Sequence, residues 1–326
     1  MSGEEYVTLS SGARFPVIGL GTYAPLHGED EIIVAVRAAV RAGYRHIDCA
    51  AIYRNEQAVG HALKELIVEG VVKREDLFVV SKLWNTCHRA DLVLPSLKKT
   101  LEDLGLEYLD LYLIHWPMAY KEGGELCPQD ENGKTLFSDV DYVDTWKALE
   151  DCQDMGLTKH IGLSNFNSKQ IQRLSDSARI QPVAMQVEVN CHNSNTKLIE
   201  FCKSKNIVVI AFAPLGTPSM DHQHVKLLDE PVLKEIAAKY KKTAAQVALR
   251  FLIQSGITAV PKSVTPSRIE ENIQRPVGST GSLRQVLPGR REDPDPQQQG
   301  SANRTSGCQE GHLTRTAKVD QSDVNK

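Results

Sequence analysis

Several features that would assign this chain to a membrane or to a nucleic acid are missing from it. No stretch approaches the roughly 18 apolar residues that a membrane-spanning helix requires. The net charge is only −3, which gives no basic surface for nucleic acid or for an anionic membrane. The opening residues, MSGEEYVTLSSG, lack the basic start and apolar core of a secretion signal. We therefore expect a cytoplasmic protein with no membrane or nucleic-acid partner.

Cysteine pairs with regular spacing are missing as well. The chain has 7 cysteines, an odd number, and no two of them are spaced as CxxC. Their positions are 49, 87, 127, 152, 191, 202 and 308. This pattern disfavours a disulfide framework and a zinc site, and it is typical of reduced thiols in the cytosol. We expect no bound metal.

The glycine pattern of a nucleotide-binding open sheet is the third absence. The first expected barrel strand runs into GLGTY, which does not match the GxGxxG pattern of that fold. An open, doubly wound sheet is the main alternative for a chain in which strands and helices alternate, and this mismatch disfavours it.

What the sequence does contain is a regular alternation of short apolar runs and helix-like segments up to about residue 273. After a hairpin (YVTL, turn SSG, RFPVIG), the expected strands end near Thr22, Asp48, Lys82, His115, Leu163, Val187, Ala211 and Pro261. The helical patterns cover 30–42, 54–69, 88–104, 143–156, 167–176, 195–205, 230–240 and 243–255. Strands rich in Val, Ile and Leu that alternate with helices indicate parallel βαβ units. The sequence therefore predicts an α/β fold, a single (β/α)8 TIM barrel with an N-terminal β-hairpin.

Polar residues stand at the ends of several of these strands, where the catalytic groups of such barrels are found. They are Asp48, Tyr53, Lys82 and His115. Taken singly, each could be a structural polar group with its hydrogen bonds satisfied. Four titratable groups of complementary type at one face of a barrel favour an active site instead.

Four motifs carry a resemblance to a known family. GYRHIDCAAIYRNE (43–56), LDLYLIHWP (109–117), IGLSNFN (161–167) and AVPKSVTPSRIEEN (259–272) occur in this order. Together they resemble the aldo-keto reductases, close to aldose and aldehyde reductases, over about residues 6–274. The resemblance implies reduction of aldehydes and ketones, sugars among them, to alcohols with hydride from NADPH. It also implies a monomer.

The resemblance implies a role for each polar residue. Tyr53 would be the general acid that protonates the carbonyl oxygen. An ordinary tyrosine is a weak acid near neutrality, so the positive charge of Lys82, held in place by Asp48, would help it to give up a proton. His115 would donate a hydrogen bond to the substrate oxygen; because relatives that reduce a steroid C=C bond carry Glu there, His115 favours carbonyl reduction.

The binding residues are implied in the same way. Thr265 and Pro266 are a good N-cap and a good first helical residue, and a helix start flanked by Lys262 and Arg268 is an anion site for the 2′-phosphate of NADPH. The cofactor-binding set is Gly21, Thr22, Asp48, Ser164, Asn165, Gln186, Phe212, Leu215, Lys262, Ser263, Thr265, Arg268, Glu271 and Asn272. The substrate-binding set is Tyr23, Trp84, His115 and Trp116. Each aromatic could equally pack in a core, and solvated surface charges are the alternative for Lys262 and Arg268.

The chain departs from the family after about residue 274. Residues 275–326 contain no Phe, Trp, Tyr, Met or Ile and are rich in Gly, Pro and Gln, a composition that predicts disorder. We expect a barrel domain at 1–274 and a disordered tail at 275–326. The final helix and the substrate loop of relatives are then missing, and the outer face of the last strand is expected to be exposed. The alternative functions are a cofactor-binding, non-catalytic barrel, like the crystallins and channel subunits that share this fold, or an unstable truncated isoform.

Overall fold

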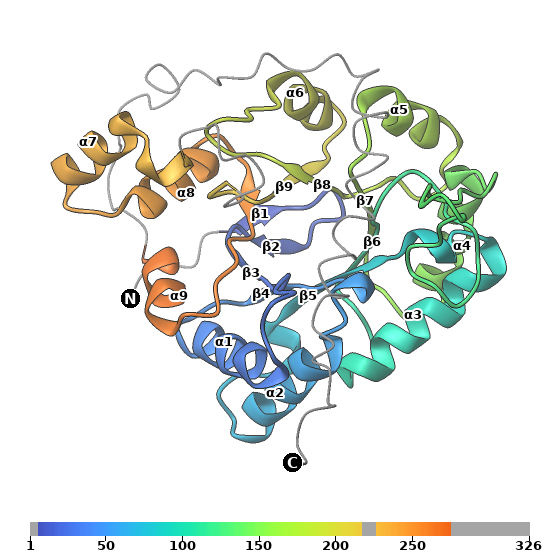
Figure 1. The fold of residues 1–326 in the computed structure, drawn as a ribbon, viewed down its shortest axis with the longest axis horizontal. Helices are drawn as coiled ribbons and strands as arrows, with labels where there is room; N and C mark the ends of the chain where they lie inside the picture. Colours follow the sequence, from blue (N-terminus) through green and yellow to red (C-terminus); the bar gives the residue numbers. More distant parts are fainter. Residues whose placement is uncertain (1–5, 217–225, 275–326) are drawn as a thin grey trace, which may run out of the picture.

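The computed structural model describes residues 6–216 and 226–274, and its centre is a nearly closed barrel of eight parallel strands (Figure 1). The strands follow one another around the barrel in chain order from β3 to β10. They are β3 (Gly19–Gly21), β4 (His46–Asp48), β5 (Phe78–Leu83), β6 (Leu111–Ile114), β7 (Ile161–Ser164), β8 (Ala184–Glu188), β9 (Val208–Phe212) and β10 (Thr258–Ala259). The predicted (β/α)8 barrel is confirmed, and the open sheet is excluded.

The predicted hairpin is also present. Strands β1 (Tyr6–Thr8) and β2 (Arg14–Pro16) pair antiparallel and lie across the ring of barrel strands in Figure 1. Gly12 adopts a φ of 86° in the turn, a conformation that glycine tolerates without strain. Phe15 is fully buried and packs with Phe78 of the barrel. The hairpin therefore closes one end of the barrel.

Helices surround the strands on the outside of the barrel (Figure 1). They are α1 (Glu29–Arg41), α2 (Glu56–Val68), α3 (Ala90–Leu104), α4 (Tyr142–Asp154), α5 (Ser168–Ser177), α6 (Thr196–Ser204), α7 (Pro231–Tyr240), α8 (Ala244–Gln254) and α9 (Pro266–Ile273). Short 3-10 helices are η1 (Ala51–Tyr53), η2 (Arg74–Asp76), η3 (Asn85–Cys87) and η4 (Leu227–Asp229). The helices from α1 to α8 lie within a few residues of the predicted segments.

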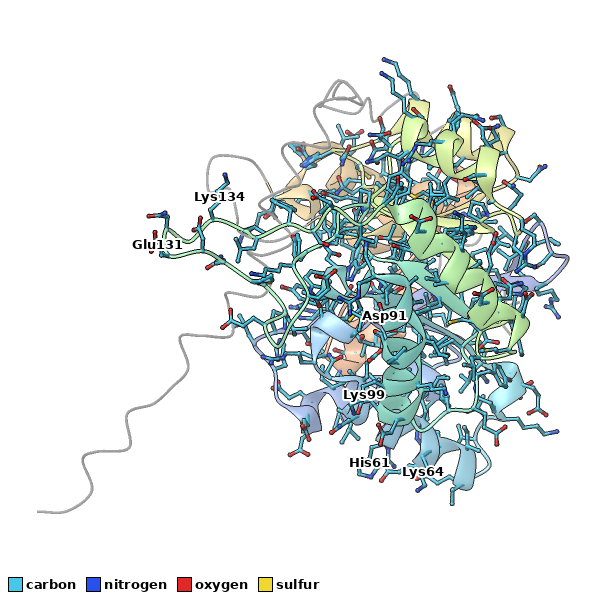
Figure 2. The ribbon with its side chains drawn as sticks, turned by 90° about the vertical axis from the view of Figure 1, so that its right-hand side faces the viewer. His61, Lys64, Asp91, Lys99, Glu131 and Lys134 are labelled. Atoms are coloured by element: carbon cyan, nitrogen blue, oxygen red, sulfur yellow. The ribbon has the colours of Figure 1, made fainter. Side chains whose placement is uncertain are left out.

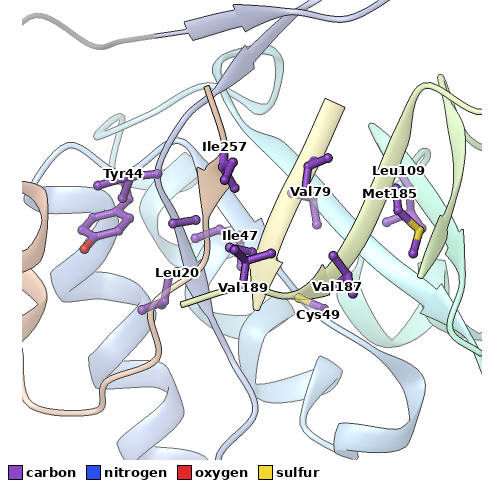
Figure 3. Close-up of a cluster of buried hydrophobic side chains, with 14 of the residues drawn as sticks. Leu20, Tyr44, Ile47, Cys49, Val79, Leu109, Met185, Val187, Val189 and Ile257 are labelled. Atoms are coloured by element: carbon purple, nitrogen blue, oxygen red, sulfur yellow. The ribbon is translucent and has the colours of Figure 1, made fainter. Parts of the chain in front are cut away.

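Successive side chains of each strand point alternately to the helices and into the barrel, as the strand repeat requires. Outward-facing residues such as Ile47 and Val79 belong to the main apolar core, part of which is shown in Figure 3. Inward-facing residues such as Phe78 and Val80 form a second cluster with the hairpin. This second cluster fills the end of the barrel interior that the hairpin covers, so polar groups are left at the opposite end.

The barrel closes between its first and last strands. Ile18 pairs with Ala259, and Gly21 pairs with Lys262, through single parallel bridges. The expectation that the outer face of the last strand is exposed is wrong for the described residues, because Thr258 and Ala259 of β10 are both fully buried. The reason is that α8 packs on β10 while α9 packs between α1 and α8, so the helix starting at Pro266 already covers this seam.

A long excursion that includes residues 123–134 separates β6 from α4. Its two arms pair at Tyr120 with Phe137 and at Gln129 with Thr135. Figure 2 shows Glu131 and Lys134 at its outer end, away from the barrel. The expected disordered tail, residues 275–326, lies outside the described residues, so the absence of a final helix and substrate loop there stays a prediction.

Three further observations concern only the described residues. None of their helices is long and apolar enough to cross a membrane. None of their His, Cys, Asp and Glu side chains forms a group suited to hold a metal ion. The six cysteines among them form no disulfide bond with one another.

Candidate active site

The four predicted catalytic residues come together at the polar end of the barrel. Asp48 ends β4, Lys82 lies in β5, and His115 directly follows β6, so neighbouring strands carry all three. All three side chains are buried. Tyr53 is the last residue of the 3-10 helix η1. Arg54, in a left-handed conformation (φ 57°), follows it and redirects the chain towards α2.

Lys82 is the centre of the group. Its side chain is fully buried, and its ammonium nitrogen lies 2.8 Å from Asp48 Oδ2 and 2.7 Å from the carbonyl oxygen of Cys49. The third contact is a longer one, 3.4 Å, to the hydroxyl oxygen of Tyr53. An ammonium group has three protons to donate, and these three acceptors account for them. The Asp48 carboxylate therefore compensates a buried positive charge that is directed at the Tyr53 oxygen.

Asp48 is held from its other side. Its Oδ1 accepts a hydrogen bond of 2.6 Å from the side-chain amide of Gln186 in β8. Its carbonyl oxygen accepts a hydrogen bond of 2.9 Å from the hydroxyl of Thr22. Sequence reasoning assigned Gln186 and Thr22 to the cofactor alone and missed these contacts, because the pattern of one strand does not show which residue faces it across the barrel.

His115 lies beside Tyr53, with 6.0 Å between the two ring centres. Burial, together with the charge of Lys82 and the neighbouring His88, lowers the pKa of His115 well below its usual value. The ring is therefore neutral at physiological pH and can donate only one proton. Its Nδ1 has no hydrogen-bond partner among the described residues.

Aromatic rings surround these polar groups. Trp84 lies 5.3 Å from His115 and Tyr23 lies 5.1 Å from Tyr53, measured between ring centres. Trp116 stacks beside His115 at 6.4 Å. Tyr23, Trp84 and Trp116, here called the aromatic wall, therefore lie beside the polar group, and their contact with a substrate stays a prediction. Tyr120, whose ring packs edge-on against Trp84, was missed, although its place four residues after Trp116 was a signal.

Trp84 also fixes the excursion after β6. Its indole N–H donates a hydrogen bond of 2.6 Å to the carbonyl oxygen of Leu126. Leu126 and Cys127 pack against the cluster formed by Trp84, Trp116 and Tyr120. The aromatic wall is thus also the support for the inner part of this loop.

A row of amide and hydroxyl groups continues from the catalytic group around the barrel. Ser164 ends β7, and Asn165 follows it in a left-handed conformation (φ 63°), which asparagine tolerates better than most residues. The Asn165 amide donates to the carbonyl oxygen of His115 at 3.0 Å and to Ser164 Oγ at 3.1 Å. With the amide nitrogens of Asn165 and Gln186 bonded within the protein, their carbonyl oxygens remain suited to accept hydrogen bonds from a carboxamide.

The residues predicted for the anion site lie where the barrel closes. Gly21, Thr22, Lys262 and Ser263 line a small recess together with apolar residues of α1. Thr265 and Pro266 occupy the N-cap and first turn of α9, as predicted, but within the described structure the Thr265 side chain caps no backbone N–H. Partial burial lowers the pKa of Lys262, and the nearby Glu31 opposes that shift. Arg268, in the first turns of α9, is exposed.

The remaining cofactor candidates lie at the same end. Phe212 ends β9, and it and Leu215 are half-buried. Glu271 and Asn272 both lie on α9. The Glu271 carboxylate already accepts a hydrogen bond of 2.7 Å from Thr243, so an adenine contact there would share that group.

Comparison with known proteins identifies the family to which the chain is similar. The model of the Aldo/keto reductase family matches residues 17–275. Aldo-keto reductase family 1 member A1 of Gallus gallus is 46% identical over 277 residues, which cover 84% of this chain and 84% of that protein. Member C1 of Homo sapiens is 45% identical over 275 residues, 82% of this chain and 85% of that protein.

A solved structure extends the likeness to three dimensions. The aldose reductase from Schistosoma japonicum is 42% identical, with a TM-score of 0.85, and the alignment covers 97% of this chain and all of that one (100%). The motifs, the barrel and the buried group around Lys82 therefore have one explanation, which is that this chain belongs to the aldo/keto reductase family.

Proposed function

We propose that this chain is an NADPH-dependent reductase that converts aldehydes and ketones to alcohols, with Tyr53 as the proton donor. The observation that carries the proposal is the contact of the buried Lys82 ammonium with both Asp48 and the Tyr53 oxygen. Because the Tyr53 oxygen accepts from Lys82, a positive charge favours release of its own proton. His115, neutral and adjacent, is suited to orient a carbonyl oxygen by a hydrogen bond.

The residues fit NADPH at two places. Ser164, Asn165 and Gln186 supply the hydroxyl and amide groups that a nicotinamide carboxamide would pair with. Lys262 and Arg268 at the start of α9 supply positive charge and a helix N-terminus for a phosphate. When bound, NADPH supplies the hydride, and Phe212 at the end of β9 offers an aromatic face for the nicotinamide ring.

The aromatic wall beside the catalytic group indicates the class of substrate. Tyr23, Trp84 and Trp116 form an apolar, aromatic surface next to the polar group, which suits a carbonyl compound with an apolar body. Tyr23 stands where close relatives usually have Trp, so the pocket is altered on that side. We propose cytosolic action as a monomer, consistent with the scattered thiols.

Oxidation of NADPH with 4-nitrobenzaldehyde, followed at 340 nm beside a titration of NADPH binding, tests this function. We expect both binding and turnover by the full chain. Binding without turnover would instead support the cofactor-binding, non-catalytic alternative.

A further inference from the structure

Glu56 is a buried carboxylic acid directly behind the catalytic group. It is the first residue of α2, three positions after Tyr53, and only 6% of its surface is exposed. Its Oε1 accepts a hydrogen bond of 2.6 Å from Ser81, and its Oε2 accepts one of 3.2 Å from Thr100 in α3. Ser81 precedes Lys82 in β5 and points outward where Lys82 points inward. One carboxyl group therefore joins the start of α2, the lysine-bearing strand and α3.

The elements around Glu56 leave it little freedom to withdraw. A Cβ on Gly60, one turn further along α2, would meet the carbonyl oxygen of Leu104 at 2.5 Å, so α2 and α3 are already in backbone contact. On the other side, the Asn55 amide donates to the carbonyl oxygen of Thr22 at 2.8 Å. A change in the charge of Glu56 therefore acts on its neighbours rather than being relieved by movement into solvent.

The charge of Glu56 is poised to change near neutrality. Burial raises its pKa to about 7, against the hydrogen bonds from Ser81 and Thr100, which favour the ionised form. Asp103 of α3 opposes its ionisation, and Lys82 of β5 favours it. Cys49 after β4 and Tyr112 of β6 are the other titratable groups that interact with it, and burial raises the pKa of each of them well above its usual value. Lys82 is therefore its one cationic neighbour among these groups.

We propose that Glu56 is a positioning residue that fixes the segment carrying Tyr53 against the strand carrying Lys82. In its ionised form it also attracts the Lys82 ammonium and thereby weakens Tyr53 as an acid. This rests on the proposed function for its kinetic consequence only. As pH rises through neutrality, Glu56 gains a negative charge. That charge attracts the Lys82 ammonium and opposes formation of a phenolate at Tyr53.

The test compares the parent chain with Glu56→Gln, which keeps the size of the side chain and removes its charge. Single-turnover rates of NADPH oxidation with 4-nitrobenzaldehyde are measured from pH 5.5 to 8.5, so that product release does not hide the step. We expect the parent rate to fall by roughly three- to tenfold across neutrality through this charge, and the Glu56→Gln rate to lack that fall. Glu65→Gln, the same change at a partly exposed position of α2, serves as the control and keeps the parent profile.

Ser81→Ala sharpens the test and covers a failure of Glu56→Gln to fold. It removes a hydrogen bond that favours ionised Glu56, so the fall in rate should move to higher pH. A profile identical in parent, Glu56→Gln and Ser81→Ala would overturn the proposal. So would a Glu56→Gln effect confined to stability or to KM.

A readout without turnover separates this inference from the proposed function. Tyrosine labelled with 13C at the ζ position gives an NMR signal for Tyr53, assigned by its loss in Tyr53→Phe. We expect Tyr53 to ionise at lower pH in Glu56→Gln than in the parent. If the parent binds NADPH but reduces no carbonyl and this shift is still seen, the proposed function has failed and the role of Glu56 stands. If carbonyls are reduced and neither the rate profile nor the Tyr53 titration responds, only the role of Glu56 has failed.

Discussion

Tyr53 is the residue on which the proposed chemistry depends most directly. Tyr53→Phe removes the proton donor but keeps the ring that packs against Tyr23 and His115. We expect kcat to fall by at least about 100-fold, the usual contribution of a general acid, while the Kd for NADPH stays nearly the same. Steady-state kinetics and a fluorescence titration of NADPH provide the two values. Turnover within about tenfold of the parent would show that another group donates the proton.

Residue identities were the part of the site that the sequence predicted best. Asp48, Lys82 and His115 lie at or next to the ends of buried strands, and strand ends meet at one face of a barrel, so their convergence could be expected. What could not be expected is which atoms touch. The Gln186–Asp48 contact joins positions 138 apart, and no local pattern encodes it. Glu56 was visible within the motif GYRHIDCAAIYRNE, but its burial behind Ser81 depends on the packing of α2 on α3.

At the scale of elements, α9 carries the prediction on cofactor choice. Changing both Lys262 and Arg268 to Met removes the side-chain charge at its start and leaves the helix backbone. A charge-assisted hydrogen bond contributes about 1.5–3 kcal/mol, so the preference for NADPH over NADH should nearly vanish. The ratio of kcat/KM for the two cofactors measures this. Discrimination that survives the double change would place the 2′-phosphate elsewhere.

The excursion after β6 carries a second prediction. Trp84→Phe keeps an aromatic ring but removes the hydrogen bond to Leu126, so the loop loses its anchor at the wall. We expect KM for bulky aromatic aldehydes to rise by about three- to tenfold, since one neutral hydrogen bond contributes about 1 kcal/mol, and KM for small aldehydes to change less.

Trp146 offers a matched control for this change. It is equally buried, and its indole N–H also donates to a backbone oxygen, that of Ile180, but it lies in α4 on the outside of the barrel. Trp146→Phe should lower stability by a similar amount and leave KM unaltered. Equal KM changes in both variants would show that the effect reports general loosening rather than the loop.

Element boundaries were predicted well because each helix repeats its apolar residues at helical spacing and ends near polar or glycine residues. The error at the last strand has a definite physical origin. The composition after residue 274 suggested that a covering helix was lost, yet the eight residues of α9 already bury Ile269 completely and pack between α1 and α8. A short helix can cover a seam when its neighbours are already in place, and a sequence pattern does not reveal the neighbours.

At the scale of the whole molecule, Glu56 makes stability depend on pH. Its pKa is raised from 4.5 to about 7 in the folded state, so the folded chain binds more protons than the unfolded chain between these values. Stability then falls as pH rises from 4.5 to about 7 and is level above that, by about 1.4 kcal/mol per pH unit or roughly 3 kcal/mol in all. Glu56→Gln removes this contribution.

Urea unfolding at pH 5 and pH 8 measures it. We expect Glu56→Gln to gain stability relative to the parent on going from pH 5 to pH 8, and Glu65→Gln to show no such gain. A difference between parent and Glu56→Gln that is the same at both pH values would show that Glu56 does not ionise in this range.

The closure of the barrel has a consequence for how the chain is made. The seam joins segments far apart in the sequence; the Tyr44 hydroxyl, for example, donates to the carbonyl oxygen of Ile269, 225 positions later. At about 5–20 residues per second, a ribosome needs roughly 10–45 s to make that intervening length. During this time β3 has β4 on one side and no final partner on the other, and an unpaired strand edge invites pairing with other chains.

The same seam brings Gly21 and Thr22 next to Lys262 and Ser263, all of them in the proposed cofactor site. A dinucleotide bound there would contact the segments that follow the first and last barrel strands at once. It would therefore favour the closed barrel, and more so at higher concentration. The cofactor would then stabilise the closed barrel during biogenesis as well as supply hydride in the finished enzyme. In a cell depleted of NADPH, a larger fraction of newly made chains should accordingly be open, and these chains should engage chaperones for longer.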